Sequence, residues 1–225
     1  MYILEGNIGA GKTTFLKLIA QKTAGISVSY EPLDDWQKRV SGRSLLESFY
    51  TDPHRWAYSM ETFAMLSRVR EHLRDQERVD PHGIIERSVY SGFYCFALNS
   101  YRNNFLTPLE WHMCKTWFDF LIPGKCRPPH GFIYLRVNPT VAYERIVKRG
   151  RTAESGITLD YLEQLHQCHE AFLIKKEGVL RELQCVPVLT VDADQDFENN
   201  GTRLEVILDT VKNFINTVTP FDKSK

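Results

Sequence analysis

The stretch Gly6-Asn7-Ile8-Gly9-Ala10-Gly11-Lys12-Thr13 decides the fold of this 225-residue chain. It matches the phosphate-binding pattern G-x-x-x-x-G-K-[ST] at every fixed position. An apolar run at 1–4 precedes it, as in a buried parallel strand, and apolar residues at helical spacing follow over 13–22. The glycines let backbone N–H groups turn toward phosphate oxygens, while Lys12 bridges the β and γ oxygens. The stretch therefore predicts a nucleoside triphosphate site between a first strand and a first helix.

The rest of the chain alternates short apolar segments with helical patterns. Further strands are predicted at 28–31, 84–86, 132–137 and 186–191. Helices are predicted at 56–78, where Pro53 breaks the pattern before the first turn, and at 91–102, 109–121, 139–149, 159–176 and 204–218. This order predicts an α/β P-loop kinase fold, with a five-stranded, mainly parallel sheet and helices on both faces. We find no repeat or linker, so we expect a single domain over 1–225, with a loose tail after 220.

Composition narrows the class of protein. Lys and Arg together number 28, as do Asp and Glu, so the chain lacks the positive excess that nucleic acid polymers attract. The five cysteines are widely spaced and odd in number, which argues against a disulfide framework and a zinc site. No apolar run approaches the roughly 20 residues of a membrane span, and no signal peptide pattern is visible. We therefore expect a cytoplasmic protein, unless a targeting segment was removed.

Charged residues gather at the ends of the predicted strands. Glu31 ends the second strand and Glu86-Arg87-Ser88 ends the third, where the carboxyl ends of parallel strands open onto a ligand crevice. A further group, Arg145, Arg149 and Arg151, flanks a glycine. Taken separately, each could be an ordinary solvated charge.

In this order the charged groups and the phosphate loop resemble the deoxyribonucleoside kinases related to deoxycytidine, deoxyguanosine and mitochondrial thymidine kinases. The likeness extends from about residue 2 to about residue 197. It is carried by GNIGAGKTT (6–14), EPLDDW (31–36), RWAYSMETFAMLSRVR (55–70), IERSVYSGFYCFA (85–97) and YERIVKRGRTAESGITLDYLEQLH (143–166). It implies an enzyme of deoxynucleoside salvage that transfers the γ-phosphate of ATP to a 5′-hydroxyl, with Mg²⁺ as cofactor and a homodimer as assembly.

The resemblance also implies roles for individual residues. Glu31 would be the general base for the 5′-hydroxyl, Arg87 would pair with this base and the reacting phosphate, and Thr13 and Glu86 would hold Mg²⁺. An arginine-rich lid would span about 145–157. The residues implied at ATP are Gly6, Asn7, Ile8, Gly9, Ala10, Gly11, Lys12, Thr13, Thr14, Arg145, Arg149, Arg151, Asp194 and Phe197. Those implied at the nucleoside are Glu31, Trp36, Leu46, Tyr50, Met60, Glu61, Phe63, Arg68, Arg87, Gly92, Phe96 and Glu154, with Tyr50 and Glu154 at the 3′-hydroxyl.

Two positions depart from the family pattern. Glu61 stands where members usually have a glutamine that pairs with the nucleobase, and an ionised carboxylate cannot donate a hydrogen bond. Guanine offers two adjacent donors, so deoxyguanosine or another purine is favoured. Gly92 stands where the deoxycytidine and deoxyguanosine branches have an aspartate, which leaves Arg68 available to Glu61. In that case a thymine or a 5-substituted pyrimidine would be accepted too.

Other functions were weighed. A nucleoside monophosphate kinase shares the loop and the lid, but it needs basic residues near its acceptor, whereas Glu31 suits a neutral hydroxyl. A nucleotide-binding interaction protein without catalytic activity would not need Lys12, Thr13, Glu31 and Arg87 together. The 109–121 helix, with Trp111, Met113, Trp117 and Phe118, would supply a dimer face or would be a core helix.

Overall fold

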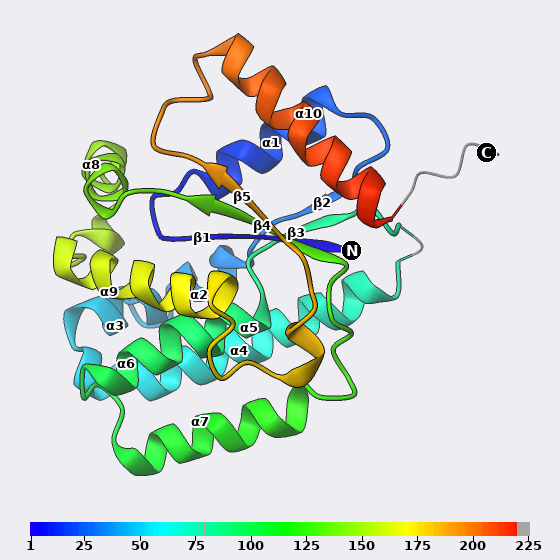
Figure 1. The fold of residues 1–225 in the computed structure, drawn as a ribbon. Helices are drawn as coiled ribbons and strands as arrows, with labels where there is room; N and C mark the ends of the chain where they lie inside the picture. Colours follow the sequence, from blue (N-terminus) through cyan, green and yellow to red (C-terminus); the bar gives the residue numbers. More distant parts are fainter. Residues whose placement is uncertain (79, 220–225) are drawn as a thin grey trace.

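The computed structural model describes residues 1–78 and 80–219, so the tail expected after 220 lies outside the described residues. Its five strands form one parallel sheet in the order β2-β3-β1-β4-β5 (Figure 1). The strands are β1 (Tyr2–Gly6), β2 (Val28–Ser29), β3 (Ile84–Glu86), β4 (Gly131–Arg136) and β5 (Val188–Asp192). The predicted α/β fold with a five-stranded parallel sheet is confirmed.

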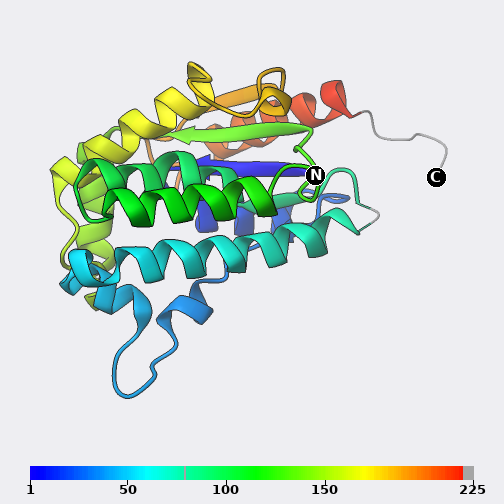
Figure 2. The same ribbon diagram turned by 90° about the horizontal axis from the view of Figure 1, so that it is seen from below.

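Helices cover both faces of the sheet, as predicted. The first face carries α1 (Lys12–Lys22) and α10 (Gly201–Val218) (Figure 1). Across the second lie α4 (Pro53–Gln76), α6 (Leu98–Arg102) and α9 (Leu159–His169), and α7 (Pro108–Leu121) packs outside them (Figure 2). The remaining helices are α2 (Leu33–Gln37), α3 (Leu45–Thr51), α5 (Val89–Ser91) and α8 (Pro139–Arg149). Because all the strands are parallel, their C-terminal ends point toward the left of Figure 1, the side on which α8 lies.

The alternation of side chains along β1 builds two cores. Tyr2 and Leu4 are fully buried in the cluster that contains Phe15 of α1, whereas Ile3 is buried in the cluster beneath the opposite face, with Met65 of α4. A strand buried on both faces has apolar residues at successive positions, which explains the unbroken run before the glycines. The glycine-rich loop is therefore anchored at the end of the central strand.

Several boundaries differ from the predictions for local reasons. Pro53 begins α4 instead of breaking it, because proline fits the first turn of a helix, and the Asp52 side chain accepts a hydrogen bond from the Arg55 N–H at 3.2 Å. The segment predicted as one helix over 91–102 contains a π-helical stretch at Gly92–Ala97. The second strand ends at Ser29, so Glu31 follows it by two residues.

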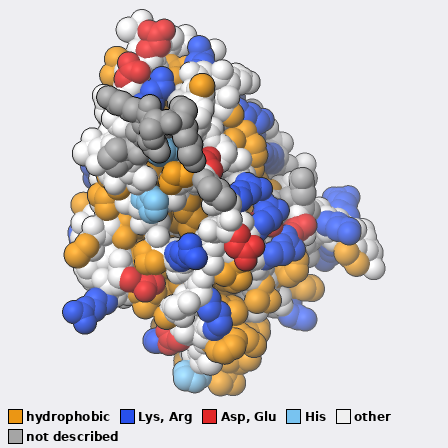
Figure 3. Space-filling view, turned by 90° about the vertical axis from the view of Figure 1, so that its right-hand side faces the viewer, with side chains coloured by type: hydrophobic (Ala, Val, Ile, Leu, Met, Phe, Trp, Pro, Cys, Tyr) orange, Lys and Arg blue, Asp and Glu red, His pale blue; other side chains and the backbone are white. Residues whose placement is uncertain are grey.

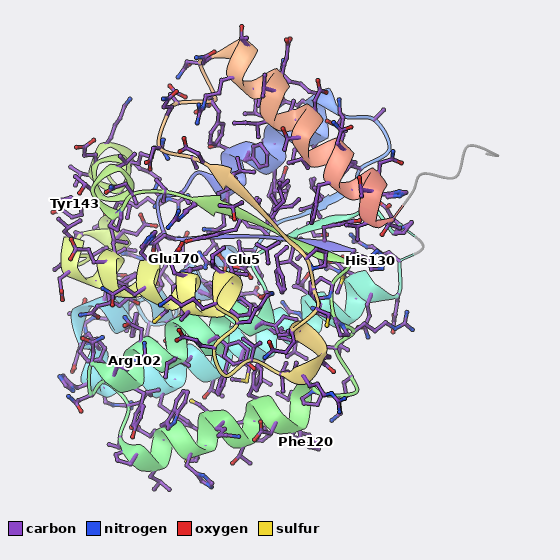
Figure 4. All side chains as sticks on the ribbon, viewed as in Figure 1. Glu5, Arg102, Phe120, His130, Tyr143 and Glu170 are labelled. Atoms are coloured by element: carbon purple, nitrogen blue, oxygen red, sulfur yellow. The ribbon has the colours of Figure 1, made fainter. Side chains whose placement is uncertain are left out.

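The surface of α7 is partly apolar. Leu109, Met113, Trp117 and Phe120 are 38–68% exposed, whereas Phe118, expected on this face, is buried. Figure 3 shows hydrophobic side chains at the level of α7, and Figure 4 places Phe120 at its outer end.

Two smaller expectations concern the cysteines and the membrane. All five cysteines are free, and four of them are buried. Within the described ranges, we find no helix with the length and apolar character needed to span a bilayer.

Candidate active site

The glycine-rich loop runs from the end of β1 into α1, as predicted. Gly9 has φ 80°, and a Cβ there would lie 2.4 Å from the carbonyl oxygen of Ala142, so only glycine fits. Lys12 Nζ donates to the carbonyl oxygens of Gly6 at 3.0 Å and Asn7 at 2.9 Å. Burial, and then the charge of Arg87, lower the pKa of Lys12 to about 7. A phosphate bound at the loop would raise the pKa of this buried amine and so favour its charged form.

Thr13 and Glu86 lie side by side at the start of α1. The Thr13 hydroxyl donates to Glu86 Oε1 at 2.7 Å, which joins the ends of the loop and of β3. A hydroxyl that donates to a carboxylate keeps an oxygen lone pair for a cation, and oxygen ligands are those that Mg²⁺ prefers. The pair therefore fits the implied Mg²⁺.

Glu31 lies just beyond β2, and its side chain is only 7% exposed. Its Oε1 atom is 2.7 Å from Nη2 of Arg68 and 3.3 Å from Nε of Arg87. Burial raises the pKa of Glu31, but Arg87, Arg68 and Lys12 outweigh burial and hold the pKa below its ordinary value. Glu31 is therefore ionised at neutral pH and can accept a proton.

A buried acid that sequence reasoning missed holds Ser88, the residue that follows Arg87. Glu5, within β1, accepts hydrogen bonds from the Ser88 backbone N–H at 3.0 Å and from the Ser88 hydroxyl at 2.5 Å. Between these segments Arg87 has φ 61°, an uncommon conformation for a side chain of its size. Glu5 lies in the interior, between the sheet and the helices of the second face (Figure 4). The sequence does single out Glu5, because it is the one charged residue in a predicted strand that is otherwise apolar up to the glycine.

One cavity of about 250 Å³ connects the loop to an apolar end. Gly9, Gly11, Lys12 and Thr13 line the first end. The apolar end is lined by Leu33, Trp36, Leu46, Phe49, Met60, Ala64 and Phe96, beside Tyr50, Glu61, Arg68, Glu154 and Tyr161. Glu31, Glu86 and Arg87 also line this cavity. The structure thus brings most of the predicted nucleoside residues together around a space that also reaches the phosphate loop.

Some predicted residues lie elsewhere. Phe63 is 42% exposed on α4 and does not line the cavity, because it lies on a different face of the helix from Met60. Sequence reasoning missed Phe49 and Tyr161, which do line it. Helical spacing alone does not separate cavity positions from core positions, so neither had a clear signal.

Glu61 does not form the expected pair with Arg68. The Ser100 hydroxyl donates to Glu61 Oε1 at 2.8 Å, and Arg68 instead donates to Glu31 through two nitrogens. Gly92 leaves room for the Arg68 side chain to reach Glu31, because a Cβ at position 92 would lie 2.8 Å from Nη1 of Arg68. Burial raises the pKa of Glu61 to about 7, against the Ser100 hydrogen bond and the charge of Arg68.

The arginines of the expected lid have carboxyl and carbonyl partners. Arg149 and Arg151 pair with Glu154 at 2.5 Å and 3.2 Å, and both line the cavity. Arg145 donates to the carbonyl oxygen of Asp194 at 3.0 Å. The predicted ATP residue Phe197 packs against Phe15 beneath the loop, with ring centroids 5.6 Å apart.

Comparison with known proteins identifies the relatives of this chain. A family model described as deoxynucleoside kinase matches residues 2–216. Deoxycytidine kinase 2 from Gallus gallus is 35% identical, over 94% of this chain and 89% of that protein. The mitochondrial deoxyguanosine kinase from Xenopus laevis is 36% identical, over 94% and 88%. Human deoxycytidine kinase is 34% identical, over 96% and 90%.

Proposed function

The chain belongs to the deoxynucleoside kinase family, and on that premise we propose that it transfers the γ-phosphate of ATP to the 5′-hydroxyl of a deoxyribonucleoside. The observation that carries this proposal is the place of Glu31. This ionised carboxylate lines the same cavity as the phosphate loop and the aromatic end. A nucleoside with its ring at the aromatic end would direct its hydroxyl toward Glu31 and the loop.

The proposed reaction divides the work among the cavity residues. Glu31 accepts the proton of the 5′-hydroxyl as the oxygen attacks the γ-phosphorus, and the bond to the β-phosphate oxygen breaks to give ADP. In this proposal Lys12 and Arg87 stabilise the charge that develops on the phosphoryl oxygens. Mg²⁺, when held near Thr13 and Glu86, supplies positive charge to the phosphates.

The lid is the proposed moving part. Arg149 and Arg151 are 36% and 41% exposed in their side chains, and both face the buried Glu154. We propose that these guanidinium groups contact the triphosphate and that residues 145–157 close over it. Closure would exclude water, which otherwise hydrolyses the donor. Tyr50 and Glu154, both at the cavity, are proposed to hold the 3′-hydroxyl.

The base preference depends on Glu61. In its ionised form this carboxylate has two acceptors, which match the N1–H and N2–H donors of guanine, so that form favours deoxyguanosine. The relatives include deoxycytidine kinases as well as a deoxyguanosine kinase. The purine preference is thus proposed for the charged carboxylate.

The proposal includes a homodimer and a cytoplasmic location. The exposed apolar side chains of α7 (Leu109, Met113, Trp117 and Phe120) would form the face of a homodimer. Light scattering on the wild type and on Trp117→Glu tests this, and a wild-type monomer at assay concentration would contradict it. A cytoplasmic location stays a prediction, and one relative is named as mitochondrial.

The proposed function is tested by incubating the purified protein with MgATP and each of the four deoxynucleosides, with the four deoxynucleoside monophosphates in parallel. We expect ADP and a 5′-monophosphate in equal amounts from at least one deoxynucleoside. Conversion of monophosphates alone would replace the proposal with a nucleoside monophosphate kinase.

A further inference from the structure

Glu61 is a buried carboxyl group at the apolar end of the cavity. The residue is 6% exposed, and the Ser100 hydroxyl holds its Oε1 atom at 2.8 Å. No ion pair among the described residues includes it. The walls beside it carry Trp36, Met60 and Phe96, which suit a flat heterocycle. A ring placed between these walls would meet Glu61 with a polar edge.

Arg68, whose charge acts on Glu61, donates its hydrogen bonds to a different carboxylate. Arg68 lies about two helical turns beyond Glu61 on α4, yet its guanidinium donates to Glu31 at 2.7 Å and 3.1 Å. It also lies over the Trp36 ring, 4.8 Å from the centroid. Gly92 leaves the space for this course. The fold therefore leaves Glu61 without a direct cationic partner.

Apart from Arg68, the titratable groups that interact with Glu61 are neutral near pH 7. They are Tyr50 of α3, Cys114 of α7 and Tyr161 of α9, and the charge of Glu61 contributes to raising the pKa of each. Burial raises the pKa of Cys114 to about 12 and those of both tyrosines above their ordinary values. Among the described residues, Arg68, on the same helix as Glu61, is the charged group that acts on this carboxyl. Its charge and the Ser100 hydrogen bond oppose burial, and together these place the pKa of Glu61 at about 7.

We propose that Glu61 recognises the substrate base in two protonation states, so that the base preference of the enzyme changes with pH around neutrality. In the neutral state Ser100 donates to Oε1, so the proton lies on Oε2 and the carboxyl offers one donor and one acceptor. That pattern matches the ring acceptor and amino donor of cytosine and adenine. In the ionised state the two acceptors match the two donors of guanine, and the proton leaves to solvent. This inference rests on the proposed kinase activity.

The test is the ratio of kcat/KM for deoxycytidine to that for deoxyguanosine, measured from about pH 6 to about pH 8. The ratio removes the effect of enzyme groups whose titration changes kcat/KM equally for both substrates, such as Glu31 and Lys12. For a group titrating near pH 7, the neutral fraction falls about tenfold over this range and the ionised fraction rises about tenfold. We expect the wild-type ratio to fall by more than about tenfold.

The Glu61→Gln variant supplies the matched control. Its amide has a donor and an acceptor at every pH, so its ratio should favour deoxycytidine and stay constant. Ser100→Ala should move the wild-type transition to higher pH, because the lost hydrogen bond favoured the ionised carboxylate. A wild-type ratio that stays flat, or that changes equally in Glu61→Gln, overturns the inference while the kinase activity stands. If no deoxynucleoside is phosphorylated, the proposed function fails first and the inference with it.

Calorimetry on the wild type gives a readout that does not depend on any variant folding. Binding of each nucleoside is measured in two buffers with different heats of ionisation, which counts protons exchanged. Deoxyguanosine should release protons near pH 6, and deoxycytidine should take them up near pH 8. Proton exchange that is identical for the two nucleosides would overturn the inference.

Discussion

Nη2 of Arg68 lies 2.7 Å from Oε1 of Glu31, in a pair whose side chains are 8% and 7% exposed. The proposed general base is thus held by a guanidinium from α4 as well as by Arg87. A buried pair of this kind fixes the orientation of the carboxylate and keeps it ionised, at the cost of some basicity. The relationship links the two departures from the family pattern, because Gly92 makes room for Arg68 beside Glu31, and Glu61 is left with the Ser100 hydroxyl instead of a cationic partner.

Replacing Arg68 with glutamine should raise the pKa of Glu31. Burial raises the pKa of Glu31, and the positive charge of Arg68 is one of the charges that lower it. Without that charge the pKa rises, so the acidic limb of the pH profile of kcat/KM should move to higher pH. The free energy of unfolding should fall by about 2 kcal/mol, as for a lost hydrogen bond between charged groups. Arg70→Gln, two positions further along α4, is the matched control because Arg70 is exposed and pairs with Asp35. An unmoved acidic limb in Arg68→Gln would show that Arg68 does not act on Glu31.

Nucleotide binding should take up a proton at Lys12. The pKa of Lys12 is about 7, so at about pH 8 the amine is mostly neutral, and contact with phosphate oxygens would raise its pKa. Calorimetry in buffers of different ionisation heat should show an uptake that approaches about one proton per nucleotide at that pH. Lys12→Met should lack this uptake, and an equal uptake in the variant would place the titrating group elsewhere.

Glu86→Gln should weaken the response to Mg²⁺. Glu86 accepts a hydrogen bond from Thr13, and loss of a supporting partner at a metal site typically costs about 10–100-fold in metal affinity. The Mg²⁺ concentration for half-maximal rate should rise by about that factor. Glu144→Gln, at an exposed position on α8, should leave it unchanged. A normal Mg²⁺ response in Glu86→Gln would remove Glu86 from the metal site.

His169 should make the folded state sensitive to acid. Burial, with the charge of Arg87, lowers its pKa from 6.5 to about 3, so above pH 6.5 the ring is neutral in both the folded and the unfolded state. As the pH falls below 6.5 the unfolded state binds a proton that the folded state does not, so stability is lost. At about pH 5 the loss should be about 2 kcal/mol. His169→Phe keeps a ring stacked on Tyr134 and should reduce the difference between urea unfolding at about pH 7 and about pH 5.

The matched control for that measurement is His112, which is exposed on α7. His112→Gln should retain the wild-type pH dependence of unfolding. If His169→Phe loses stability on acidification as strongly as the wild type, the acid sensitivity comes from other groups.

Local patterns predicted the sheet and most of the cavity. The glycine spacing at 6–13, the acidic residue beyond β2 and the one at the end of β3 indicate where backbone turns and charges meet, because parallel strands end at one edge of the sheet. Helix ends were less certain, as at Pro53, which is compatible with either a break or a first turn.

Long-range pairings could not be predicted. Arg68 has two acidic residues within reach, and the choice of Glu31 over Glu61 depends on the packing of α4 against Gly92 and Trp36. The pKa of Glu61 likewise follows from burial, which is a property of the assembled fold. Phe63 was placed at the cavity because α4 has apolar residues on several faces, and spacing does not say which face meets the ligand.

The measurement that tests the central claim most directly compares the wild type, Glu31→Gln and Glu47→Gln for formation of a deoxynucleoside 5′-monophosphate with saturating MgATP. Glu47 lies on the neighbouring helix α3 and pairs with exposed Arg39, so its variant controls for loss of a carboxylate. We expect kcat to fall by about 10²–10⁴-fold in Glu31→Gln, as for loss of a general base, and to stay near wild type in Glu47→Gln. Full activity in Glu31→Gln, or no 5′-monophosphate from the wild type, would contradict the account.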